Sequence, residues 1–203
     1  MKSLPTTARG RRSRAAIVDA AARLMHERGL AAPSMDDILA ASGTGKSQLY
    51  HYFDGKRDLA IAVLHHQFER VMAEQPSLRD PTCDDLSRWR DEVLRAHRSS
   101  AWGTCPLGVF VGQTDHDPVL QETLAGLFAR WQDAITGLVV RALHAGHLSP
   151  DIDPAAAGCA LLTALQGGII LSHLRGEAEP LARALDGVIS GLIRRPASTP
   201  EDT

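Results

Sequence analysis

Residues 42–53 have the sequence SGTGKSQLYHYF, and the five residues GTGKS within them resemble the end of a phosphate-binding loop. That loop follows the pattern G-x-x-x-x-G-K-[ST] and lies between a β-strand and a helix. The first glycine of the pattern would stand at position 40, which is Ala40. The preceding segment starts with Ser34 and two nearby aspartates, which indicates a helix with Ser34 as its N-cap. Both features differ from a phosphate-binding loop. A nucleotide-binding protein that uses GTGKS is therefore only the alternative interpretation, and a nucleotide titration would test it.

The same stretch fits the second half of a helix-turn-helix unit better. We expect one short helix over residues 34–41 and a second over about 45–51. Gly43 lies between them and gives the backbone the freedom that a tight turn needs. Leu49 and Phe53 are spaced i, i+4, so they would pack the second helix inward.

The polar residues of the second predicted helix suit contact with DNA. Glutamine can pair with adenine, lysine can reach guanine or phosphate, and tyrosine can touch phosphate or a thymine methyl group. The residues that this helix would present are Lys46, Ser47, Gln48, Tyr50 and His51.

The charge distribution supports a polyanionic partner for the N-terminal part alone. The formal net charge is −2, but residues 1–60 hold ten Lys/Arg against six Asp/Glu, while residues 61–203 hold twelve against eighteen. The N-terminal part of the chain, called the head below, is thus basic and the remainder is acidic. This distribution suggests nucleic acid as the partner of the head. Arg11, Arg12 and Arg14 would add contacts to the DNA backbone or minor groove and make binding depend steeply on salt.

Composition limits the class of protein. The chain of 203 residues is 44% apolar and 23% charged, as in ordinary soluble proteins. We find no apolar run near the roughly 18–20 residues that span a membrane, and no secretory signal. The three cysteines are far apart, which predicts a reducing cytoplasm and no disulfide.

The candidate chemistry is binding rather than catalysis. No Ser-His-Asp set or carboxylate pair is suitably placed, so we expect no enzyme. Neither the adjacent His65 and His66 nor His144 and His147 form a closed ligand set, so we expect no metal and no cofactor.

Helical periodicity continues through the rest of the chain, which predicts an all-α protein of about nine helices. We expect a disordered basic arm (1–12), a three-helix helix-turn-helix domain (13–56), a helical effector-binding and dimerisation bundle (57–195) and a disordered tail (196–203).

The helix expected around residues 155–171 is apolar on nearly every side. Such a helix is buried on every side, which suggests its own core on one face and a partner on the other. Together with the amphipathic last helix it would build a four-helix interface between two chains, although a central helix in a monomeric bundle explains the pattern too. The expected interface residues are Leu162, Leu165, Ile169, Leu185, Ile189 and Leu192.

Residues 17–64 resemble the TetR family of bacterial transcriptional regulators. The resemblance rests on Ile17, Ala20, Ala21, Leu24, Gly29, Ser34, Asp37, Ile38, Ala41, Gly43, Lys46, the run LYHYF at 49–53, Lys56, Leu59 and Val63. It implies a dimer that binds operator DNA with two such helix-turn-helix domains, and a ligand that weakens this binding. The DNA contacts that it implies are Ser34, Thr44, Gly45, Lys46, Ser47, Gln48, Tyr50, His51 and Lys56. Gly45 stands where the family usually has a capping serine or threonine, so we expect Thr44 to cap the second helix instead.

The C-terminal part is similar to the LmrA/YxaF-like branch of that family, through GTCPLG at 103–108, Asp117-Pro118, Phe128 with Trp131, and LQGG at 165–168. This resemblance implies a pocket for a small, largely apolar or aromatic effector. The expected lining residues are Phe68, Trp102, Cys105, Phe110, Gln113, Trp131, Gln166 and His173. The sequence thus predicts a homodimeric ligand-responsive repressor in the cytoplasm. A transcriptional activator with the same head and a helical bundle that does not bind DNA are the alternatives.

Overall fold

The computed structural model describes residues 5–100 and 103–193, and within these ranges the chain is all α-helical with no β-strand. The expected all-α fold is confirmed, with eight α-helices and two short 3-10 helices where about nine helices were expected. The elements are α1 (Ala8–Arg28), α2 (Met35–Ser42), α3 (Lys46–Tyr52), α4 (Lys56–Ala73), η1 (Pro76–Leu78), α5 (Leu86–Ser99), η2 (Gly108–Phe110), α6 (Pro118–His144), α7 (Pro154–Arg175) and α8 (Glu179–Leu192).

The chain folds as two compact units. The first consists of Met1–Val71 with Cys105–Ala129, and the second of Met72–Thr104 with Arg130–Thr203. This division differs from the boundary expected at residue 56, because the segment around η2 and the first half of α6 fold with the N-terminal helices. Leu107 and Phe110 in that segment are fully buried, and burial of side chains this large stabilises the arrangement by roughly 2 kcal/mol each.

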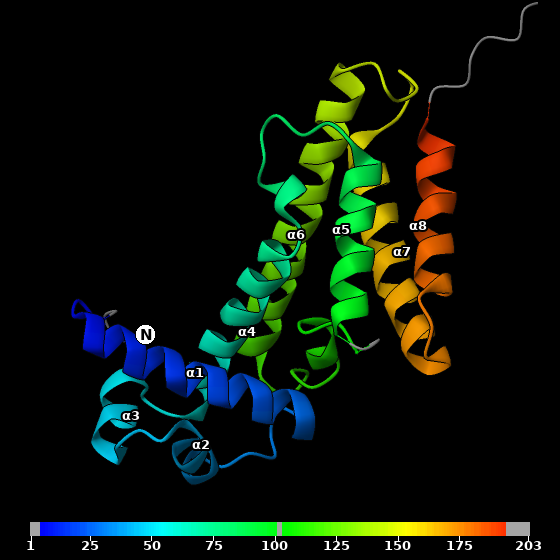
Figure 1. Cartoon of the computed structure of the whole chain (residues 1–203). Coiled ribbons are helices and arrows are strands. Elements are labelled where there is room, and N and C mark those ends of the chain that lie inside the picture. The colour runs from blue at the N-terminus through cyan, green and yellow to red at the C-terminus, as the bar shows by residue number, and fades with distance from the viewer. Residues whose placement is uncertain (1–4, 101–102, 194–203) are drawn as a thin grey trace, which may run out of the picture. The chain divides into compact units, whose positions relative to one another are not determined.

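In the first unit, α2 and α3 both pack against α1 (Figure 1). The buried face of α1 carries Ile17, Ala21, Leu24 and Met25, at the spacing of one helical stripe. Gly29 ends the helix with a φ of 89°, which favours glycine.

The expected disordered arm over residues 1–12 is wrong for its second half, because α1 begins at Ala8. The Oγ1 of Thr7 caps the helix by accepting the backbone N–H of Gly10 at 3.1 Å. Arginine has a high helix propensity, so the basic run continues the helix toward its N-terminus. Residues 1–4 and the expected tail 196–203 lie outside the described residues.

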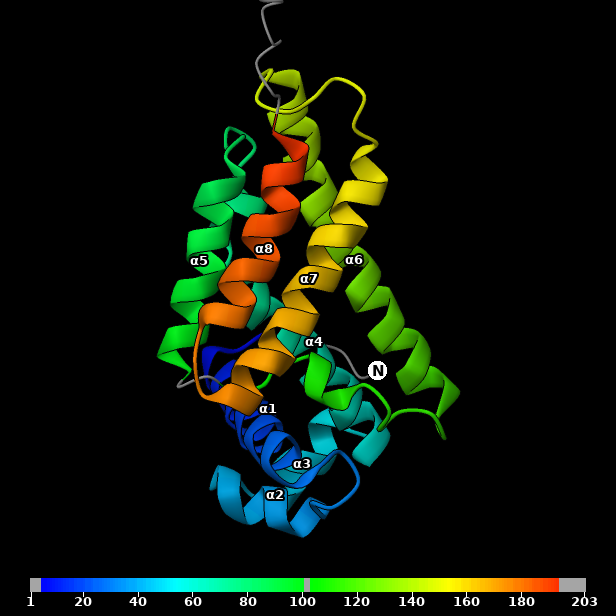
Figure 2. The same cartoon turned by 90° about the vertical axis from the view of Figure 1, so that its right-hand side faces the viewer.

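In the second unit, α7 and α8 lie side by side (Figures 1 and 2). Gly168 permits this approach, since a Cβ atom at that position would lie 2.8 Å from the Cα of Leu181. Arg90 of α5 and Asp186 of α8 form a two-bonded ion pair, with N···O distances of 2.9 and 2.8 Å. The last helix ends at Leu192 rather than near 195, because Ile193 is extended and pairs with Leu148 in an isolated bridge.

A polar cluster lies in the core of the second unit. The Oε1 atom of buried Gln75 accepts the indole N–H of Trp89 at 2.8 Å and that of Trp131 at 3.3 Å. Nearby in sequence, the buried carboxylate of Glu92 accepts the hydroxyl and backbone N–H of Ser77 at 2.7 and 3.0 Å. These bonds satisfy polar atoms that would otherwise be costly to bury.

α7 is a long and apolar helix. Contrary to the expectation from apolar runs, its 22 residues are long and apolar enough to cross a membrane when length and composition alone are considered. Core helices of soluble proteins pass the same test, and α7 packs along α8, with Leu161, Leu165 and Gly168 among its buried residues.

Candidate nucleic-acid interface

α2 begins with two reciprocal hydrogen bonds between a serine and an aspartate. The Oγ of Ser34 accepts the backbone N–H of Asp37 at 3.1 Å, and the backbone N–H of Ser34 donates to Oδ2 of Asp37 at 2.8 Å. The hydrogen bond from the Ser34 side chain is the main reason why the pKa of Asp37 lies below its usual value. The predicted N-cap at Ser34 is confirmed.

The turn between α2 and α3 depends on Gly43, which has a left-handed conformation with φ 63° and ψ 19°. Thr44 does not cap α3, so that expectation is wrong. Its Oγ1 lies 2.8 Å from Oγ of Ser42, and the N-cap residue is Gly45, whose N–H donates to Oε1 of Gln48 at 3.4 Å. GTGKS therefore joins two helices, which is not the strand-to-helix setting of a phosphate-binding loop.

α3 has a buried side and an exposed side. Leu49 is 1% exposed, and so is Phe53 just after the helix, which confirms their predicted inward packing. The exposed residues of α3 are Lys46, Ser47, Tyr50 and His51, while Gln48 is half-buried. The structure thus brings four of the five contact residues predicted on this helix together on one accessible side of a short, anchored helix.

The remaining predicted DNA contacts have different environments. Ser34 is exposed at the N-terminus of α2, and Arg11 and Arg12 are exposed on the first turns of α1. Arg14 places its guanidinium 5.1 Å from the ring centroid of Phe53. Lys56 donates from Nζ to the backbone carbonyl of Ala31, so it also fastens the loop between α1 and α2.

Two residues of the segment before α6, Gln113 and Asp117, bond to the loop after α1 and to α4 within the first unit. The Oε1 of Gln113 accepts the backbone N–H of Leu30 at 2.7 Å, and its Nε2 donates to the carbonyl of Val109 at 2.7 Å. Arg57 forms an ion pair with Asp117, and this pair contributes to the lowered pKa of that carboxyl group. Sequence analysis missed both roles, because a contact across 83 or 60 residues leaves no periodic pattern.

The expected effector-lining residues are divided between the units. Phe68, Cys105, Phe110 and Gln113 belong to the first unit, and Trp131, Gln166 and His173 to the second, while Trp102 lies outside the described residues. The Sγ of Cys105 accepts the backbone N–H of Gly108 at 3.2 Å, so this thiol stabilises the turn before η2. Gln75, which bonds to two tryptophans, is a buried polar residue that was not among the sequence-based candidates.

The six residues expected at the dimer interface mostly point into the protomer. Leu165 and Leu185 are at most 1% exposed, and Leu162, Ile189 and Leu192 are also buried, while Ile169 is half-buried. Most of these side chains are therefore buried within the protomer itself, and their place at a dimer interface stays a prediction. The large exposed apolar side chains of α7 are Ile170, Leu171 and Leu174, at 59%, 47% and 74% exposure.

Comparisons with known proteins agree with this geometry. Residues 17–63 match the family described as bacterial regulatory proteins, tetR family, and residues 93–188 match the tetracyclin repressor-like C-terminal domain. The finer resemblance to the LmrA/YxaF-like branch is not confirmed. The transcriptional regulator AcuR of Cereibacter sphaeroides is 27% identical over 163 residues, which cover 76% of this chain and 74% of AcuR.

Solved structures share the fold. A regulatory protein TetR from Rhodobacter sphaeroides superposes with a TM-score of 0.77 at 22% identity, covering 89% of this chain and 99% of that one. SmeT of Stenotrophomonas maltophilia in complex with triclosan gives a TM-score of 0.72 at 21% identity, covering 94% of this chain and 98% of SmeT. With both family matches in their expected places along the sequence, the chain belongs to the tetR family of bacterial regulatory proteins.

Proposed function

We propose that this transcriptional regulator is a homodimeric repressor that acts in the cytoplasm and is released from its operator by a small, largely apolar or aromatic effector. One observation carries the DNA-binding part. α3 exposes Lys46, Ser47, Tyr50 and His51, while Leu49 and the following Phe53 are buried beneath it.

Operator binding by two heads follows from this arrangement. The two α3 helices of a dimer would enter successive major grooves about 34–36 Å apart on a near-palindromic site. Lys46 and Tyr50 would contact phosphates and base edges, and the first turns of α1 would bring Arg11 and Arg12 to the backbone. Neutralised phosphates make the affinity fall steeply with salt.

Dimerisation is assigned to α7 and α8, as expected from sequence, but through a different face. Ile170, Leu171 and Leu174 expose large apolar side chains on one helix, and exposed apolar patches commonly mark protein–protein contacts. A second copy of the chain is the partner that this family architecture favours.

Effector control is supported by the family and by the triclosan complex of SmeT, a protein of the same fold. Aromatic residues among the expected lining set, such as Phe68, Phe110 and Trp131, suit a flat or apolar ligand. The ligand can change the DNA affinity only by its differential affinity for the DNA-competent and incompetent states.

Fluorescence anisotropy of the full chain on DNA from upstream of its own gene would test the proposal. A scrambled duplex serves as control, each at two salt concentrations, with and without ATP. Binding to the upstream duplex alone, persisting at moderate salt and unaffected by ATP, is the expected result. Equal and salt-sensitive binding to both duplexes would contradict sequence-specific regulation, and an effect of ATP would support the nucleotide-binding alternative. A reporter gene behind the same operator would separate repressor from activator.

A further inference from the structure

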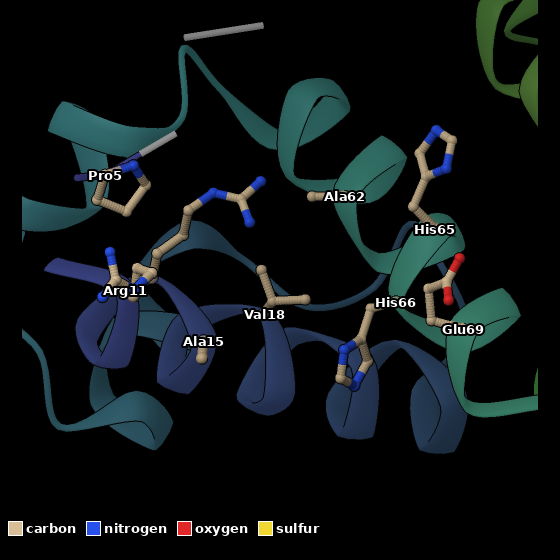
Figure 3. A pocket seen from close by; sticks show the side chains of 9 residues that line it. Pro5, Arg11, Ala15, Val18, Ala62, His65, His66 and Glu69 are labelled. Carbon is tan, nitrogen blue, oxygen red and sulfur yellow. The ribbon is translucent and has the colours of Figure 1, made fainter. Parts of the chain in front are cut away.

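A pocket of about 410 Å³ lies between α1 and α4 in the first unit (Figure 3). This volume is within the roughly 300–1,000 Å³ that small-molecule sites usually have. The pocket lies within one compact unit, and none of its lining residues belongs to the expected effector set. Its lining residues are Pro5, Arg11, Arg14, Ala15, Val18, Ala62, His65, His66 and Glu69.

Two matching helix faces form the walls. The residues from α1 are 11, 14, 15 and 18, and those from α4 are 62, 65, 66 and 69. Both sets follow the spacing i, i+3, i+4, i+7, which places four side chains on one face of a helix. His65 and His66, which sequence analysis considered only as metal ligands, both line this pocket (Figure 3).

The middle of the pocket is apolar and hollow because the side chains there are small. Val18 and Ala62 are buried, at 4% and 7% exposure, and Ala15 lies on the opposite side of the hollow from Ala62. The short side chains of Ala15 and Ala62 leave space that longer aliphatic side chains would fill. An apolar ligand body of modest size would restore the contacts that this space lacks.

Two guanidinium groups stand at the N-terminal end of the α1 wall. Arg11 donates to the backbone carbonyl of Thr6, and Arg14 lies over the ring of Phe53. These two partners, a backbone carbonyl and an aromatic ring within the described part of the chain, hold the arginine side chains in place. Neither partner carries a negative charge. The site therefore offers positioned cations of the type that bind carboxylates.

The charge balance selects a monoanion. Two arginines and Glu69 leave the lining with a net charge of +1 when His65 is counted as neutral and His66 is counted as an ion pair with Asp19, at an N···O distance of 3.2 Å. A ligand with one negative charge would neutralise the lining without leaving excess charge in a partly apolar site.

We propose that this pocket binds a small organic monoanion, namely a carboxylate with an apolar body of about ten carbon atoms, a size that suits a pocket of this class. The body would lie against Ala15, Val18 and Ala62, and the carboxylate would lie at Arg11 and Arg14. This site is separate from the effector site proposed above, and the inference does not depend on the DNA-binding function.

Isothermal titration calorimetry of the full chain with decanoate tests the site, with 1-decanol as an uncharged ligand of the same length. Ala15→Phe fills the hollow from an exposed position, and Ala73→Phe at the exposed end of α4 is its matched control. We expect decanoate to bind the native chain and the control alike, and Ala15→Phe to weaken binding by about tenfold or more. We expect Arg11→Gln to weaken decanoate by about tenfold and to leave 1-decanol unaffected, since an ionic hydrogen bond is lost.

A second measurement avoids the dependence on variants. In protein labelled with ¹³C at alanine methyl groups, decanoate should shift the Ala15 and Ala62 signals and leave that of Ala73 in place. No binding of decanoate overturns the proposal, as does equal affinity in the Ala15→Phe chain or shifts confined to other alanines. Equal binding of 1-decanol also overturns it, because the carboxylate would then contribute nothing. Operator affinity measured without decanoate tests the proposed DNA-binding function. Failure of that function can therefore be distinguished from failure of the decanoate site.

Discussion

The side-chain carbonyl of Gln113 accepts the backbone N–H of Leu30 at 2.7 Å and so joins the segment before α6 to the loop after α1. Leu30 is 5% exposed, so its N–H would be left without a partner in an apolar setting if the glutamine were lost. We expect Gln113→Met to lower the free energy of unfolding by about 1–2 kcal/mol. Urea unfolding would measure this, with Gln121→Met on the exposed face of α6 as control. Equal stability of the two variants would show that the bond contributes nothing.

Lys46→Ala should weaken operator binding by about 1–3 kcal/mol and reduce the salt slope by about one, because one phosphate or base contact is lost. Tyr50→Ala should have a comparable effect on affinity, since 43% of this side chain is exposed. Anisotropy at several salt concentrations would measure both. Arg23→Ala, which removes an exposed cation from the middle of α1, should change little. If a variant loses its dimer instead, the residue has a structural role.

Leu174→Glu, alone or with Ile170→Glu, should dissociate the dimer without unfolding the protomer, because the side chains are 74% and 59% exposed. Sedimentation velocity would give the association state, and circular dichroism the helical content. Val111→Glu changes an equally apolar and 63% exposed position of the first unit and should leave the dimer intact. A dimer that persists after both changes in α7 would place the interface elsewhere.

Gly168→Ala should lower the free energy of unfolding by about 1–3 kcal/mol, the usual cost of an overfilled helix contact. The added Cβ would lie 2.8 Å from the Cα of Leu181, a backbone atom that cannot move away cheaply. Its neighbour Gly167 has no such contact within 4 Å, so Gly167→Ala should stabilise the helix by about 0.5–1 kcal/mol. Thermal unfolding compares them, and the reverse order would contradict the close approach.

Stability should fall as the pH is lowered from 7.5 to 5.5. Burial holds the pKa of His97 below its ordinary value, and the charge of His173 lowers this pKa further. In the unfolded chain His97 has a pKa of about 6.5, so below that pH the unfolded state binds the proton first and is favoured. Burial, and next Arg70, likewise lower the pKa of His26.

Urea unfolding at the two pH values would measure this dependence. His97→Gln should reduce the loss of stability between pH 7.5 and 5.5, because the glutamine does not titrate. His116→Gln, at an exposed position of the first unit, is the control. An unchanged pH dependence in His97→Gln would contradict the assignment to the buried imidazole.

Local features were the ones that could be predicted from the sequence. Ser34 caps α2 through an atom three residues away, Gly43 turns the chain within two residues, and Leu49 and Phe53 face inward through helical spacing. Each depends on interactions within about one helical turn, which propensity and periodicity describe well.

Features that join distant segments could not be predicted in this way. The sequence suggested Gln113 as an effector contact and Leu165 as an interface residue, but it indicated neither the bond of Gln113 to Leu30 nor the burial of Leu165 within its own protomer. Periodicity marks a side chain as inward-facing without naming the element that covers it.

The sequence by itself determined that the chain is helical, where the helix-turn-helix lies and which side of α3 carries its polar residues. Only the tertiary structure decided which apolar face of α7 remains exposed, that Lys56 fastens the α1–α2 loop, and that the alanines of α1 and α4 leave a hollow. The physical reason is range: caps and stripes arise within a few residues, whereas burial and pockets depend on packing between segments far apart in the chain.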